Sequence, residues 1–142
     1  MSLVLRSLPR ITLLLVLALV IVWMIAPASA LDFLRLEYDW VDRTIDFAYA
    51  AIPGADLDHL LAFALLGFVT HFGWAQGRAW QVALGMLCVG SLVEVVQLWI
   101  PGRDAAVSHA MLDTIGGMAG FGFAWVVAYA WGGKGLPEDP AG

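Results

Sequence analysis

Charge is scarce in this sequence. Only 13% of its 142 residues are Asp, Glu, Lys or Arg, against roughly 25% in ordinary soluble domains. The seven basic residues are outnumbered by twelve acidic ones, which argues against the clustered positive charge that nucleic-acid binding requires. A lone cysteine, Cys88, excludes an intramolecular disulfide. The sequence also lacks a Gly-rich phosphate loop, a nucleophile elbow and a paired-cysteine motif.

Long apolar runs, by contrast, are abundant. Hydrophobic residues make up 61% of the chain, and the mean hydropathy is +0.83. Four segments have about the length of 17–25 residues that spanning helices need: 11–26, 57–75, 79–100 and 106–131. Tryptophans lie near the ends of the last three, as at a membrane interface: Trp74, Trp80, Trp99 and Trp131. The sequence therefore predicts an all-α membrane protein with four transmembrane helices.

The first segment, 1–30, admits two interpretations. Arg6 and Arg10 precede its apolar run, and Ala28–Ala30 reads "ASA", which resembles a signal-peptide cleavage site. The segment is either a retained transmembrane helix or a cleaved signal peptide. Both interpretations place residue 31 and those after it outside the cytoplasm.

A short amphipathic helix is expected within the first extracytoplasmic loop, 31–56. Apolar residues recur there at helical spacing: Val41, Ile45, Ala48 and Ile52. Charged residues occupy the opposite face: Asp39, Asp42, Arg43 and Asp46. Such a helix would lie on the membrane surface. Residues 57–131 would then form a three-helix core, and 132–142 a frayed cytoplasmic tail.

The distribution of basic residues sets the expected orientation. With the N-terminus inside, four lie inside, namely Arg6, Arg10, Arg78 and Lys134. Three lie outside, namely Arg35, Arg43 and Arg103. The positive-inside rule thus favours a multi-pass protein with both termini in the cytoplasm.

Polar residues gather around one turn between the last two spans. Glu94 lies seven residues before Pro101, and Asp113 lies seven residues after Ala106. At about 1.5 Å of rise per residue, both carboxylates are expected roughly 10 Å below the turn. Gln97 shares a helix face with Glu94, and His109 shares one with Asp113.

These carboxylates are expected to turn away from lipid. A charged group at mid-bilayer costs on the order of 2.5–3.5 kcal/mol. Arg103, His59 and His109 are the expected partners of Glu94 and Asp113. The result would be a recessed polar pocket that opens to the outer face between the second, third and fourth spans. The Gly116–Gly120 stretch, "GGMAG", would let neighbouring helices approach closely.

These motifs together resemble the VanZ-like family of small bacterial membrane proteins. The resemblance is carried by "HLLAF" from His59, "EVVQ" from Glu94, "PGR" from Pro101 and "DTIGGMAG" from Asp113, in the family's order and spacing over roughly 55–125. The chain departs from the pattern where the family's Asp-Lys pair falls on Ala55 and Asp56. It departs again where a family Asp and Asn fall on His109 and Asp113.

The resemblance implies a cell-envelope role and a place in the bacterial inner membrane. The family is named for a protein linked to resistance to glycopeptide antibiotics, chiefly teicoplanin. We expect the polar pocket to bind or modify a membrane lipid or another lipid-linked or anionic cell-wall component. Candidate catalytic residues are Glu94 as base or acceptor, with His59 and His109 moving a proton or orienting the head group.

Four further residues are candidates for substrate binding. Arg103 would hold an anionic group, since its planar fork suits phosphate and carboxylate. Asp58, Gln97 and Asp113 would line the site or position the other side chains. His59, Glu94, His109 and Asp113 are plausible ligand types for a metal ion, but no His-x-x-x-His or Glu-x-x-His spacing supports such a site, so no metal site is predicted. The sequence leaves the cofactor open.

Two other functions remain open. The polar cluster could be structural, in a non-enzymatic scaffold or accessory subunit for a membrane-protein partner. A small proton-coupled transporter is a weaker candidate, because four spans without internal repeats fit the usual transporter architectures poorly.

Overall fold

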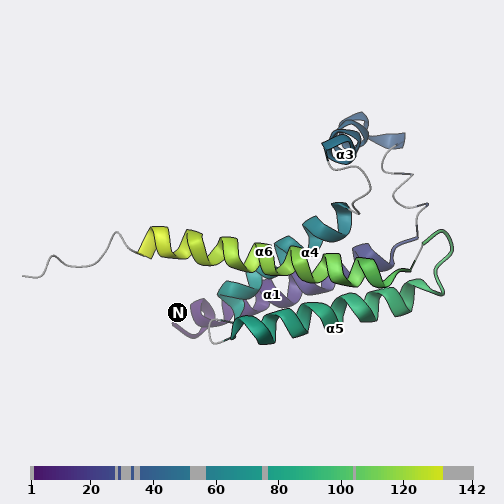
Figure 1. Ribbon diagram of the computed structural model, residues 1–142. Coiled ribbons are helices and arrows are strands. Elements are labelled where there is room, and N and C mark those ends of the chain that lie inside the picture. Colours follow the sequence, from purple (N-terminus) through teal and green to yellow (C-terminus); the bar gives the residue numbers. More distant parts are fainter. Residues whose placement is uncertain are drawn as a thin grey trace, which may run out of the picture.

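A computed structural model describes residues 2–27, 29, 33, 36–51, 57–74, 77–103 and 105–132. Throughout these ranges the regular secondary structure is helical, with no strand. The helices, shown in Figure 1, are α1 (Ser2–Ile25), α3 (Asp39–Ala51), α4 (Leu57–Gly73), α5 (Ala79–Gln97) and α6 (Val107–Gly132). The predicted all-α fold is confirmed. The predicted tail was 132–142, but Gly132 is the last residue of α6; residues 133–142 and the Ala55–Asp56 positions lie outside the described residues.

Three helices are long and apolar enough to cross a membrane: α1, α5 and α6. The fourth, α4, has 17 residues, which is near the lower limit of about 17 for a span. Large apolar side chains on the outside of the bundle are exposed, among them Leu19, Leu92 and Ile115. An outward-facing apolar surface of this kind is suited to lipid contact, so the chain is a membrane protein.

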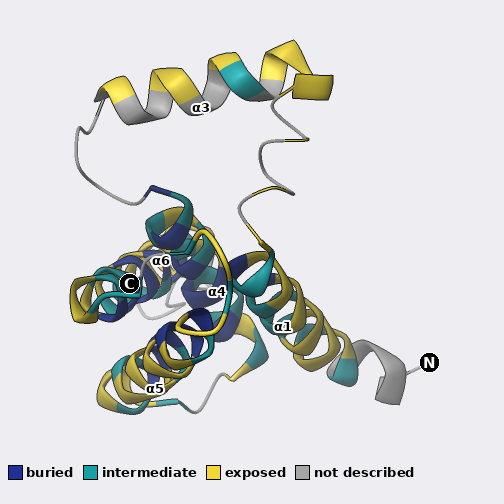
Figure 2. Cartoon of the chain, turned by 90° about the vertical axis from the view of Figure 1, so that its right-hand side faces the viewer, coloured by how far each residue is buried: buried dark blue, intermediate teal, exposed yellow. Residues whose placement is uncertain are grey.

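The four long helices form an antiparallel bundle. Figure 1 shows α1 and α5 running toward the α5–α6 turn, with α4 and α6 running away from it. α4 packs against α6 and α1, and α5 packs against α6. The turn itself uses Pro101 and Gly102, whose φ of 78° suits a residue without a side chain. Figures 1 and 2 show α3 lying apart from the bundle, as a separate helix in the predicted loop.

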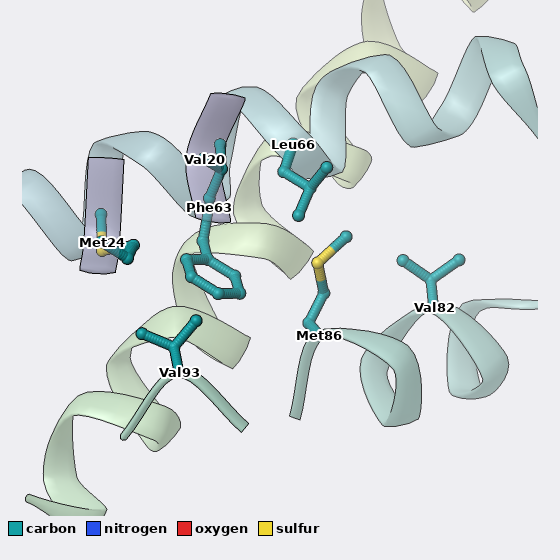
Figure 3. Close-up of a cluster of buried hydrophobic side chains, with 7 residues drawn as sticks. All are labelled: Val20, Met24, Phe63, Leu66, Val82, Met86 and Val93. Atoms are coloured by element: carbon teal, nitrogen blue, oxygen red, sulfur yellow. The ribbon is translucent and has the colours of Figure 1, made fainter. Parts of the chain in front are cut away.

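The apolar core lies among α1, α4 and α5. Figure 3 shows its seven buried side chains: Val20, Met24, Phe63, Leu66, Val82, Met86 and Val93. Phe63 of α4 is fully buried, and α1 contributes Val20 and Met24 beside it. The first helix is therefore packed into the bundle and helps to bury the centre of α4.

Small residues bring α4 and α6 into close contact. A Cβ atom added at Gly67 would meet the carbonyl oxygen of Gly117, and one added at Gly120 would meet that of Ala64. A Cβ at Gly116 would similarly approach the carbonyl oxygen of Leu60. The close approach predicted from the Gly116–Gly120 spacing is confirmed. It fixes the position of the first turn of α4 relative to α6.

Candidate functional site

Four ionisable side chains meet near the α5–α6 turn. They are His59 in the first turn of α4, Glu94 near the end of α5, and His109 and Asp113 in the first turns of α6. We call these four residues the ionisable cluster. Their burial is nearly complete for three members, with exposed fractions of 3% for His59, 7% for Glu94 and 0% for Asp113.

The Nδ1 atom of His59 faces both carboxylates. It lies 3.0 Å from Asp113 Oδ1 and 3.9 Å from Glu94 Oε1. The ring of His109 is tilted against that of His59, with centroids 5.2 Å apart. The matched depth of Glu94 and Asp113, predicted from their distance to the turn, is thus what brings both to one histidine.

Glu94 uses its two oxygens differently. Oε2 accepts a hydrogen bond of 2.7 Å from the backbone N–H of Ala106, just before α6 begins. A negative charge there satisfies a helix N-terminal donor and complements the helix dipole. Oε1 has no hydrogen-bond partner, and it lies 3.4 Å from His109 Nδ1. Oε2 of this carboxylate therefore has a structural role, whereas Oε1 faces the histidines.

Asp113 fits against the backbone of α5 at a glycine. A Cβ atom added at Gly90 would stand 2.8 Å from Asp113 Oδ2, so the missing side chain makes room for the carboxylate. Oδ2 is buried without a hydrogen-bond partner. Gly90 was not among the predicted site residues, although its position one turn before Glu94 places it on the same helix face.

Arg103 does not contact the partners that were expected for it. It was expected to pair with Glu94 or Asp113, but its Nε donates to Ala26 O at 3.0 Å and its Nη2 to Trp23 O at 3.4 Å. Its Nη1 lies 3.7 Å from Asp58 Oδ2. The last carbonyls of a helix lack intrahelical donors, and a guanidinium with five N–H groups can satisfy several at once. Arg103 therefore fastens the end of α1 to the turn.

Gln97 has the same kind of partner. Its Nε2 donates to Met24 O at 2.8 Å, so it joins α5 to α1 and makes no hydrogen bond with Glu94. The acceptors Trp23, Met24 and Ala26 were not predicted from the sequence. The end of α1 could have indicated them, because the last carbonyls of a helix need hydrogen-bond donors from outside the helix.

The ionisable cluster is partly exposed on the side nearest the α5–α6 turn. The side chains of His109, Arg103 and Asp58 are 19%, 12% and 23% exposed, whereas those of the deeper residues are almost closed off. The cluster combines carboxylate acceptors with imidazoles that can move a proton at neutral pH. His59, Glu94 and His109 also each offer one ligand atom to a common space, within 4.8 Å of one another.

Comparison with known proteins identifies the family of this chain. A family model described as VanZ/LLP1 matches residues 11–128. Neither the curated proteins nor the solved structures include a match. The matched region contains α4 and α5, most of α1 and α6, and every member of the ionisable cluster. The chain therefore belongs to the VanZ/LLP1 family and is a VanZ-like membrane protein.

Proposed function

We propose that this protein binds or modifies a lipid-linked or anionic cell-wall component at the end of the bundle that carries the α5–α6 turn. In this proposal that end faces outward from the bacterial inner membrane, and both termini lie in the cytoplasm. The ionisable cluster forms the floor of the site, and Asp58 and Arg103 lie at its rim. A contribution to teicoplanin resistance is the phenotype that the family name suggests.

The proposal is supported by contacts among the ionisable side chains that the packing of the helices does not require. Gln97, Arg103 and Glu94 Oε2 each bind a backbone group at a helix end. His59, Asp113 and Glu94 Oε1 instead face one another within the bundle. Ionisable residues inside membrane spans are costly and mark functional sites by default.

Each cluster member has a chemical role in this proposal. Glu94 Oε1 is the acceptor or base, because Oε2 is already held by Ala106. His59 and His109 move a proton or orient the head group, and Asp113 fixes the ring of His59 through the contact of 3.0 Å. An anionic group would reach Arg103 at Nη1 by taking the place of Asp58 Oδ2, which lies 3.7 Å from that nitrogen, since Nε and Nη2 face the carbonyls of Ala26 and Trp23.

Native mass spectrometry of the purified protein tests this proposal. The parent, Glu94→Gln and His71→Gln would be purified from the same membranes, and any retained lipid identified. The amide oxygen of the introduced glutamine can still accept from Ala106, so Glu94→Gln removes charge and keeps the helix contact. His71→Gln is the matched control, because His71 lies at the other end of α4, against Phe121.

We expect the parent and the His71→Gln control to retain the same phosphorylated or glycosylated lipid, and Glu94→Gln to lose it. Equal lipid on all three proteins would contradict binding at the ionisable cluster.

A scaffold without chemistry is the second candidate. The contacts of Gln97 and Arg103 with α1 favour it, because they show that polar groups near the turn do hold helices together. In that case Glu94→Gln and Arg103→Ala would lower the amount of folded protein and leave the function per molecule unchanged. The two candidates are separated by the teicoplanin tolerance of cells that carry the parent or a variant at the same abundance of folded protein.

A further inference from the structure

We infer that His59, Glu94 and His109 form a binding site for a divalent transition-metal ion, of which Zn²⁺ suits the ligands best. Two imidazoles and one carboxylate are a common ligand set for catalytic zinc. No spacing in the sequence predicts the site, because the three ligands come from three different helices, α4, α5 and α6.

The separations within the cluster fit ligands around an ion. Glu94 Oε1 lies 3.4 Å from His109 Nδ1, a separation beyond the usual range of about 2.7–3.2 Å for hydrogen bonds. Two atoms that each lie about 2.1 Å from a tetrahedral ion stand about 3.4 Å apart. His59 offers a ligand atom within 4.8 Å of the other two. Glu94 and His109 therefore already have the separation of two ligands, and His59 would complete the set by a movement of its side chain.

The charge of the cluster also calls for a cation. Glu94 and Asp113 are buried, and their partners are histidines and one backbone N–H. In the part of the chain that the structure describes, no lysine or arginine pairs with either carboxylate. Glu94 Oε1 and Asp113 Oδ2 are both buried without a hydrogen-bond partner. Buried charges are normally paired or bound to a metal, and a divalent ion would balance two carboxylates.

Asp113 would act as a positioning residue. Its Oδ1 lies 3.0 Å from His59 Nδ1, so Asp113 would accept from that nitrogen, fix the orientation of the ring and leave Nε2 to bind the ion. Carboxylates in contact with metal-binding histidines are usual, and their loss typically weakens metal affinity by about 10–100-fold. The room for Asp113 is provided by Gly90, where a Cβ atom would meet the carboxylate.

A bound ion would also support the proposed function, although the metal site does not depend on that function. A divalent cation beside the two carboxylates would attract an anionic ligand, in addition to Arg103. Metal binding can be measured on protein that carries no envelope component. Failure of one proposal would therefore be distinguishable from failure of the other.

Metal binding by the full-length protein in detergent provides the test. After treatment with a chelator, Zn²⁺ affinity would be measured by competition with a chromogenic chelator, and stoichiometry by elemental analysis. The variants are His59→Gln, Glu94→Gln, His109→Gln and Asp113→Asn, with His71→Gln as the matched control.

We expect one Zn²⁺ per chain for the parent and for His71→Gln. Each of the three ligand variants should lose at least about tenfold in affinity, and Asp113→Asn about 10–100-fold. Mg²⁺ in excess should not displace Zn²⁺, because Mg²⁺ prefers oxygen ligands in octahedral geometry. Unchanged affinity in the ligand variants, or equal loss in the His71→Gln control, would overturn the proposal.

A measurement on the parent alone covers the case in which a variant fails to fold. X-ray absorption of the Zn²⁺-loaded protein should show a nitrogen and oxygen shell with two imidazoles. Cys88 is exposed on α5 and lies outside the cluster, so sulfur should be absent. A sulfur ligand, or less than stoichiometric zinc, would refute the site.

Discussion

At the scale of single residues, Glu94 connects folding with chemistry. Oε2 completes the start of α6 through Ala106, while Oε1 faces the histidines without a hydrogen bond. A substitution at this position therefore has two separable effects. Removal of the charge should affect the site, and removal of the whole side chain should also affect the helix start.

We predict that Glu94→Ala destabilises the protein and that Glu94→Gln does so much less. Alanine leaves the Ala106 N–H without its acceptor, which costs about 1–3 kcal/mol. Glutamine keeps an oxygen in place, so its stability should stay within about 1 kcal/mol of the parent. Equilibrium unfolding in detergent micelles measures both. Equal destabilisation by the two substitutions would show that the charge, rather than the hydrogen bond, holds α6 in place.

The sequence predicted part of this residue-level picture. The distances of Glu94 and Asp113 from the turn determine their depth, because helical rise is constant. The direction of Arg103 was not predictable from the same pattern. It depends on where the end of α1 packs, and nothing local to the "PGR" turn specifies that contact.

At the scale of helices, the end of α1 is fastened to the α5–α6 turn. Met24 O accepts from Gln97, while Trp23 O and Ala26 O accept from Arg103. Apolar length was enough to predict that α1 exists as a helix. The helices that α1 packs against were not predictable, because a helix that faces lipid and a helix packed inside a bundle have similar amino-acid compositions.

We predict that Gln97→Leu loosens the end of α1. Leucine is similar in size but cannot donate to Met24 O, and a buried acceptor without a donor costs about 1–3 kcal/mol. Hydrogen exchange should become faster in the last turn of α1, and the free energy of unfolding should fall. Ser91→Ala, at an exposed position on α5, should change neither. Unchanged exchange at the end of α1 in Gln97→Leu would argue against this contact.

A second helix-scale prediction concerns the close contact of α4 with α6. Gly67→Ala places a methyl group against the carbonyl oxygen of Gly117, and such overpacking costs about 1–3 kcal/mol or more. Gly122→Ala is the matched control on α6, since no atom lies within 4 Å of its Cβ position. Thermal unfolding should show a lower midpoint for Gly67→Ala alone. Equal midpoints for both variants would mean that these helices can separate at little cost.

At the scale of the whole molecule, the antiparallel bundle places all cluster residues at the end that carries the α5–α6 turn. That arrangement follows from the order of spans, which the sequence predicted. The proposed orientation puts this end outside the cytoplasm, where an envelope component would reach it.

Labelling of single cysteines in intact cells tests the orientation. In a Cys88→Ala background, Pro101→Cys should react with a membrane-impermeant maleimide, because the turn is exposed and faces outward in the proposal. Ala79→Cys, exposed at the other end of the bundle, should react only after the cells are opened. The reverse pattern would place the ionisable cluster at the cytoplasmic face.

The proposed site depends most on the contacts of Glu94 and Asp113 with Nδ1 of His59. Solid-state NMR of the protein in lipid bilayers can measure dipolar couplings between histidine ring nitrogens and carboxyl carbons. The structure predicts strong coupling of His59 to the carboxyl carbon of Asp113, in line with the contact of 3.0 Å, and a weaker coupling to that of Glu94, whose oxygen is 3.9 Å away. His71 should show neither. Absence of both couplings at His59 would mean that the two carboxylates do not share a site.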